Sequence, residues 1–90
     1  MQAALRHFAS PAFWRHYKRL PQAIRALSDK NFELLKADPQ HPALHLKQIG
    51  DFWSVRVGRG TRALGTSCEG GITWFWIGSH ADYDRLLRRG

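Results

Sequence analysis

Residues 52–80 read FWSVRVGRGTRALGTSCEGGITWFWIGSH, and this stretch decides the fold of the chain. Residues 53–58 alternate between apolar and polar positions, as strands with one buried face do. Two glycine-rich turns separate a second strand, Thr61–Ser67, from its neighbours on either side. Residues 72–77 are apolar on both faces except for Thr73, which predicts a central strand that is covered on both sides.

The sequence before this stretch predicts a further strand and an irregular N-terminus. Residues 44–47 alternate between leucine and a polar side chain, so we expect a strand there that ends at residues 49–51. Residues 5–8 fit either a short edge strand or a frayed arm. Short connections between successive strands favour antiparallel pairing.

Two helices are predicted between the N-terminus and the first of these internal strands. Ser10 and Pro11 provide an N-cap and a first helical residue, and Pro21 opens a second helix of about four turns. The apolar faces contain Phe13, Trp14, Tyr17 and Leu20 in the first helix, and Ile24, Leu27, Phe32, Leu34 and Leu35 in the second. Aromatic residues at this spacing predict packing, with base stacking as the alternative for the tryptophans.

The chain closes with a short helix. Ser79 and Asp82 have the spacing of a capping box, which starts a helix over Ala81–Arg88. Leu86 and Leu87 are the residues through which we expect this helix to dock. Ninety residues, 43% of them hydrophobic, suit one domain over residues 1–90. The prediction is an α+β fold, with an N-terminal helical hairpin packed on a small twisted antiparallel sheet.

The charge of the chain points to anionic partners. Fourteen lysines and arginines against seven acidic residues give a formal net charge of +7. Such a field favours nucleic acid or an acidic protein as the partner. Cys68 is the only cysteine, which excludes an internal disulfide and a thiolate zinc site, and the histidines lack metal-ligand spacing, so no metal or cofactor is expected. With no signal or transmembrane segment in the sequence, we expect a cytoplasmic protein.

Four motifs resemble those of a known family. These are Leu46-Lys47 before a glycine turn, residues 52–57, Gly60-Thr61-Arg62, and Trp76–Tyr83. Together with the order and length of the elements, they resemble the RelE/ParE superfamily of toxins from bacterial type II toxin–antitoxin systems, and RelE in particular. The resemblance covers nearly the whole chain and implies a microbial-ribonuclease-like fold.

The resemblance also implies a function. RelE-like toxins cut mRNA in the ribosomal A site without a metal, whereas ParE-like toxins poison DNA gyrase. Both kinds are held inactive by an antitoxin. We therefore expect a metal-independent, ribosome-dependent mRNA endonuclease, with mRNA, the ribosome and an acidic cognate antitoxin as partners, in a higher-order toxin–antitoxin complex. The alternatives are a ParE-like gyrase poison without nuclease activity and a non-catalytic basic module that binds RNA or a protein.

Two arginines are candidate catalytic residues. By the resemblance, Arg62 holds the scissile phosphate, and a guanidinium is suited to this because it binds two phosphate oxygens and stays charged. The alternative for Arg62 is a pair with an acid or with the antitoxin. Arg56 matches a basic family position and points away from the core that its apolar neighbours build.

His80 is the third candidate catalytic residue, and Tyr83 a candidate for binding substrate. His80 follows the central strand, where several family members place a catalytic histidine or arginine, and histidine suits acid–base work near neutral pH. Its alternative role is to cap the last helix. Tyr83, one turn later, either stacks on a base or packs as a helix aromatic.

Lys47 and His45 complete the predicted site as substrate-binding residues. Lys47 matches a family phosphate contact. His45 stands near the position where some members place a glutamate base, and it either replaces that base or is an ordinary exposed histidine. Ser54 departs from the family, which often has lysine there, and the terminal tyrosine of RelE has no equivalent.

Overall fold

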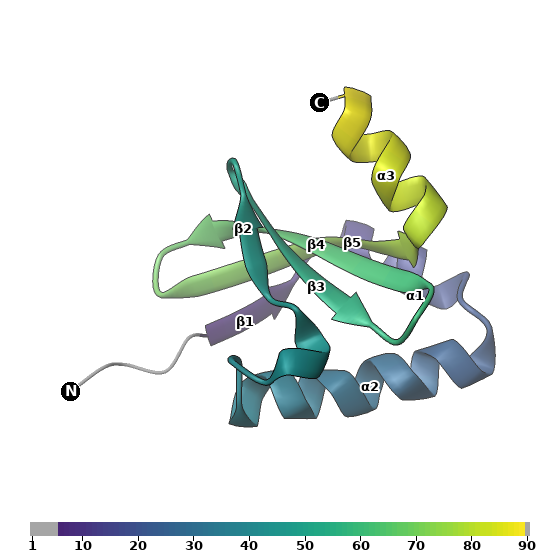
Figure 1. The fold of residues 1–90 in the computed structure, drawn as a ribbon, viewed down its shortest axis with the longest axis horizontal. Coiled ribbons are helices and arrows are strands. Elements are labelled where there is room, and N and C mark those ends of the chain that lie inside the picture. The colour runs from purple at the N-terminus through teal and green to yellow at the C-terminus, as the bar shows by residue number, and fades with distance from the viewer. Residues whose placement is uncertain (1–5, 90) are drawn as a thin grey trace.

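The computed structural model describes residues 6–89, which form a five-stranded sheet and three helices (Figure 1). The strand order is β1-β5-β4-β3-β2. The bounds are Arg6–Ala9 for β1, Lys47–Ile49 for β2, Phe52–Val57 for β3, Thr61–Cys68 for β4 and Gly71–Ser79 for β5. The α+β fold class is confirmed.

One pairing differs from the expected antiparallel sheet. The neighbours from β2 to β5 pair antiparallel, but β1 pairs parallel to β5. A parallel neighbour needs a long crossover, and the helical hairpin with the strands that follow it provides one. The sheet is therefore mixed. The predicted edge strand is present as β1, and Leu5 lies outside the described residues.

The helices begin where the sequence predicts. Helix α1 spans Pro11–Lys18, α2 spans Gln22–Ala37 and α3 spans His80–Arg89. The hydroxyl of Ser10 accepts a hydrogen bond from the Phe13 amide at 3.3 Å, and that of Ser79 accepts one from the Asp82 amide at 3.1 Å. Both caps satisfy amides that the first turn of a helix leaves unpaired. None of the helices within residues 6–89 combines the length and apolar character needed to span a bilayer.

The sheet separates two apolar layers. In Figure 1, α2 lies below the sheet and α3 rises above it. The larger cluster, between the sheet and the helical hairpin, consists of Leu35, Leu44, Val55, Val57, Ala63, Ile72, Trp74 and Ile77. The smaller cluster, under α3, consists of Leu64, Trp76 and Tyr83. Because both faces are covered, the prediction for residues 72–77 is confirmed.

A β-bulge sets which side chains of β5 enter each layer. Leu64 pairs with Trp76 and the next residue, Gly65, pairs with Trp74, so Phe75 is an extra residue in β5. An inserted residue reverses the alternation of side chains along a strand. Trp74 therefore belongs to the hairpin layer and Trp76 to the layer under α3, although they lie two residues apart.

Three local predictions are wrong. Residues 44–46 do not form a strand: Pro42–Leu44 is a single 3-10 turn that ends at His45 with φ of 46°, and β2 begins only at Lys47. Trp14 was expected in the core but is 47% exposed. Leu86 is also exposed, because the side of α3 that faces the sheet carries Tyr83 and Leu87 instead.

Candidate functional site

The candidate site is built around two arginines on neighbouring strands. Arg56 in β3 and Arg62 in β4 are directly opposite each other in the antiparallel ladder, so they share one face of the sheet. This is the α3 side, because Val55, Val57 and Ala63, which alternate with the arginines, belong to the hairpin layer. The predicted outward orientation of Arg56 is therefore confirmed.

Both guanidinium groups are held by main-chain carbonyls. Nε of Arg56 donates to the carbonyl oxygen of Gly58 at 2.9 Å, and Nη1 of Arg62 donates to that of Thr61 at 3.1 Å. Neither side chain forms an ion pair within the described chain. Like charges directly opposite each other destabilise a sheet. A phosphate would relieve this repulsion, because each guanidinium has further donors to offer it.

Lys47 extends the positive charge along the same face. It lies directly opposite Ser54, which precedes Arg56 by two residues and therefore shares its face. The Lys47 side chain is exposed. The ladder thus places one ammonium and two guanidinium groups across β2, β3 and β4. We call Lys47, Arg56 and Arg62 the cationic row.

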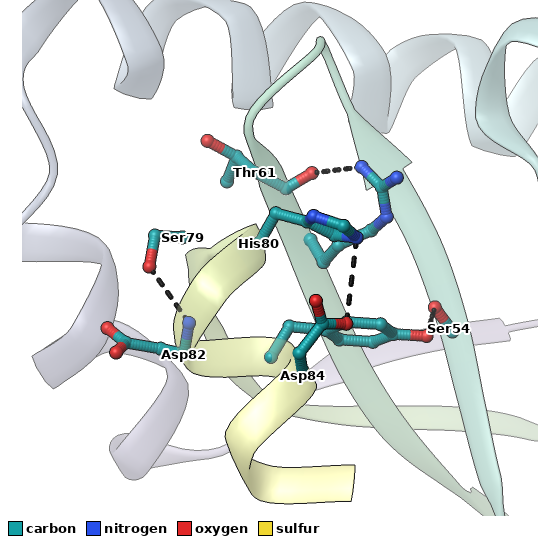
Figure 2. A network of polar contacts seen from close by, with 8 residues as sticks. Ser54, Thr61, Ser79, His80, Asp82 and Asp84 are labelled. Atoms are coloured by element: carbon teal, nitrogen blue, oxygen red, sulfur yellow. Dashed lines mark hydrogen bonds and ion pairs between the residues drawn. The ribbon is translucent and has the colours of Figure 1, made fainter. Parts of the chain in front are cut away.

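His80 stands where β5 passes into α3. Its amide donates to the carbonyl oxygen of Gly60 at 2.8 Å, which ties the start of the helix to the turn before Arg62. Nε2 of His80 lies 3.6 Å from Oδ1 of Asp84, and both side chains are about half exposed. Figure 2 shows His80 and Asp84 on the same side of α3 as Ser54. A solvent-accessible imidazole is therefore fixed close to the arginine ladder.

Asp84 is the residue that sequence reasoning missed. It follows His80 by four positions, the spacing at which helix side chains meet. Its carboxylate is placed to orient the imidazole and to pair with its protonated form. The i, i+4 spacing from His80 is the sequence signal for Asp84, which lies one residue beyond the family motif Trp76–Tyr83.

Tyr83 is part of the core. Its side chain is 5% exposed, and its hydroxyl is hydrogen-bonded to that of Ser54 at 2.8 Å (Figure 2). The His80 ring stacks on it with centroids 5.9 Å apart. The covered ring favours the alternative of a packed helix aromatic, with Tyr83 supporting His80 from below, and its contact with substrate stays a prediction. Ser54, itself 2% exposed, has no space for the lysine of the resemblance.

His45 does not lie in the strand that was predicted to carry it. It is exposed and ends the 3-10 turn in a left-handed conformation, two residues before β2 begins. The ladder pairings that align the cationic row therefore do not include it. A role for His45 as a base stays a prediction without support from these contacts.

The arrangement can bind a phosphodiester and move one proton. The cationic row neutralises phosphate charge, and charge that grows on a pentavalent phosphorus is stabilised by the same groups. The imidazole of His80, at the start of α3, is the group in this arrangement that can donate or accept a proton. Within the part of the chain described, no three His, Cys, Asp or Glu side chains gather as metal ligands would.

No protein-family model matches the chain, and no curated protein matches it. Several solved structures do share its fold. RelE in the RelB–RelE antitoxin–toxin complex from Methanococcus jannaschii is 15% identical, with a TM-score of 0.69 over 89% of this chain and 98% of that one. The isolated E. coli RelE toxin is 14% identical, with a TM-score of 0.60 over 97% and 98%.

The YoeB dimer from Staphylococcus aureus is 23% identical, with a TM-score of 0.57 over 87% of this chain and 99% of that one. At such identities the likeness establishes architecture. The chain has the fold of the RelE toxins, as the motifs of its last third predict.

Proposed function

We propose that this chain, built on the RelE fold, is the toxin of a type II toxin–antitoxin system and cuts mRNA without a metal. The observation that carries the proposal is the facing pair Arg56 and Arg62, neither of which forms an ion pair within residues 6–89, with the His80 amide bonded to the turn that precedes Arg62. Lys47 adds a further positive charge on the same face. A structural sheet gains nothing from two guanidinium groups placed directly opposite each other.

In the proposed reaction, the 2′-hydroxyl of the RNA attacks the adjacent phosphorus and the bond to the 5′-oxygen breaks. Arg62 and Arg56 hold the non-bridging oxygens and stabilise their growing charge. His80 transfers a proton, as the acid that protonates the leaving 5′-oxygen or as the base that accepts the 2′-hydroxyl proton. Asp84 keeps the ring oriented, and the ring rests on Tyr83.

We propose that cleavage depends on the ribosome because the site supplies only one group for proton transfer. One imidazole serves one of the two proton transfers, and the glutamate base of some relatives has no counterpart before Lys47. If the ribosome holds the 2′-hydroxyl in line with the phosphorus, this positioning compensates for part of the missing general base or acid. We therefore propose that the substrate is mRNA already positioned in the A site.

The proposed regulator is an acidic cognate antitoxin. The net charge of +7 favours an acidic binding partner. Two of the structures that share this fold are complexes of toxin and antitoxin, RelB–RelE and YoeB–YefM. In this proposal the toxin is encoded beside a small acidic protein that binds it.

Expression of the chain without an antitoxin tests this function. We expect translation to stop and new mRNA 5′ ends to appear, and we expect His80→Ala to reduce these ends by about 10²-fold or more. Measuring DNA breakage in the same cells separates the two toxin classes. DNA breaks with intact mRNA would assign the chain to gyrase poisoning and refute the nuclease proposal.

A further inference from the structure

A cavity lies on the opposite side of the sheet from the side chains of the cationic row. It is a cavity of about 240 Å³ between the helical hairpin and the sheet, and we call it the hairpin cavity. Val55, Val57 and Ala63 form its floor. Because these residues alternate with Ser54, Arg56 and Arg62 along β3 and β4, the sheet separates the cavity from the proposed nuclease site.

The hairpin cavity is large enough for a single-ring molecule. An apolar protein cavity of about 150 Å³ stays dry and binds benzene, so this volume would hold a ring with a substituent. Its walls are mainly apolar, with Leu35 and Leu44 beside aromatic rings. Water gains few hydrogen bonds from such walls, which favours an apolar occupant.

Aromatic side chains gather at this cavity beyond what the core needs. Within residues 6–89 the exposed large hydrophobic residues are Phe8, Trp14, Phe32 and Leu86, and the first three line the cavity. They come from β1, α1 and α2, so three separate elements converge on it. Exposed apolar side chains gathered in this way mark binding sites rather than packing errors.

A buried hydroxyl opens into the cavity. Ser28 in α2 is 8% exposed and lines the cavity, and the described structure gives its hydroxyl no hydrogen-bond partner. Within the described residues, every fully buried side-chain oxygen has a hydrogen-bond partner. Because the Ser28 oxygen has none, it must be partly accessible from the cavity. An incoming polar group is therefore the partner that Ser28 can reach.

Two other polar groups at the cavity are already paired, and Asn31 and Arg56 also border it. Nδ1 of His7 accepts a hydrogen bond from Nε1 of Trp74 at 3.1 Å, and the Asp29 carboxylate accepts one from the Tyr17 hydroxyl at 2.8 Å. Burial and the nearby Lys36 lower the pKa of His7, so its imidazole is neutral at neutral pH. These pairings leave Ser28 and Asn31 as polar contacts on α2, and of the two Ser28 is the buried one.

We propose that the hairpin cavity binds a small neutral aromatic molecule, one ring in size, whose hydroxyl or amine group hydrogen-bonds to Ser28. The aromatic walls bind the ring, and the hydroxyl at Ser28 fixes its orientation. This site is distinct from the proposed nuclease site: the cavity borders β3 at Arg56, but strand alternation directs the Arg56 side chain to the other face of the sheet.

Phenol and toluene test the proposal, since they match in size and differ in the hydroxyl. We expect both to shift amide resonances of the cavity residues in NMR titrations of the full chain, with dissociation constants on the order of 1 mM or tighter. Shifts absent at ten times that concentration, or confined to the cationic row, would overturn the site.

Two variants, with a third as a control, test the contacts between the ligand and the cavity. Ser28→Ala should weaken phenol about 3–10-fold and leave toluene unchanged, since one hydrogen bond is lost. Ala63→Leu fills the floor and should abolish both, whereas Ala26→Leu on the exposed side of α2 should change neither. If Ala63→Leu does not fold, the Ser28→Ala comparison decides alone. Equal effects of Ser28→Ala on phenol and toluene, or binding retained by folded Ala63→Leu, would overturn the proposal.

Discussion

At the scale of single residues, direct cross-strand pairing decides which side chains can act together. Arg56 and Arg62 meet because β3 and β4 pair them directly, and His80 joins them because its amide is bonded to Gly60. Tyr83 lies beneath this arrangement, with its hydroxyl on Ser54. The serine that departs from the family motif is thus explained by the buried tyrosine above it.

We predict that Tyr83→Phe lowers the free energy of unfolding by about 1–3 kcal/mol, because it leaves the buried Ser54 hydroxyl without a partner. Chemical denaturation measures this loss. Ser54→Ala in the Tyr83→Phe background should cost less than Ser54→Ala alone, since the hydrogen bond is already gone. Strictly additive losses would show that the two hydroxyls do not stabilise each other.

At the scale of elements, the strands and helices of the last third follow from local sequence, and the exceptions have identifiable causes. The period-two pattern of residues 53–58 and the Ser79 cap predict β3 and the start of α3. The bulge at Phe75 was not predictable, because an inserted residue leaves a strand equally apolar while reversing its faces. The parallel pairing of β1 rests on contacts about 65 residues apart in the chain, which no local pattern contains.

In the candidate site, too, local sequence pattern predicts some features and tertiary packing determines the others. The outward orientation of Arg56 follows from strand alternation, but the burial of Tyr83 depends on how α3 docks. His45 was misplaced because alternating leucines suit a strand as well as a 3-10 turn next to a left-handed residue. The family motifs predict the candidate catalytic positions, whereas tertiary packing determines which of those side chains are accessible.

The contact between β1 and β5 gives a prediction at this scale. A Cβ at Gly71 would overlap the backbone of Arg6, including its carbonyl oxygen, so a larger residue pushes β1 away from the sheet. We expect Gly71→Ala to lower the free energy of unfolding by about 1–3 kcal/mol, measured by denaturant titration.

Gly60→Ala is the matched control for Gly71→Ala. A Cβ there meets no atom within 4 Å, so stability should change by less than about 0.5 kcal/mol. If the two variants were equally stable, β1 would not be packed on β5 as described.

At the scale of the whole molecule, the cationic row lies on the face of the sheet opposite the larger apolar cluster. In the proposed function, the net charge of +7 attracts RNA and the cationic row is where its phosphates bind. The hairpin layer on the other face supplies most of the core. The proposed phosphate site and most of the core therefore lie on opposite faces of the sheet.

RNA binding should therefore depend steeply on salt. The logarithm of the affinity for single-stranded RNA should fall linearly with the logarithm of salt concentration, by about 0.7 for each phosphate neutralised. Arg56→Ala should reduce this slope by about 0.7, whereas Lys30→Ala, an exposed charge on α2, should leave it unchanged. Fluorescence anisotropy over a salt series measures both slopes, and equal slopes would place the RNA elsewhere.

The most direct test of the account is the rate at which the purified chain cuts mRNA on programmed ribosomes. We predict cleavage by the wild type, a loss of about 10²–10³-fold in Arg62→Ala, and full activity in Lys30→Ala, since Arg62 stabilises the reacting phosphate and Lys30 does not. Equal rates for Arg62→Ala and Lys30→Ala, or intact mRNA with the wild type, would contradict the assignment of the arginine face as a nuclease site.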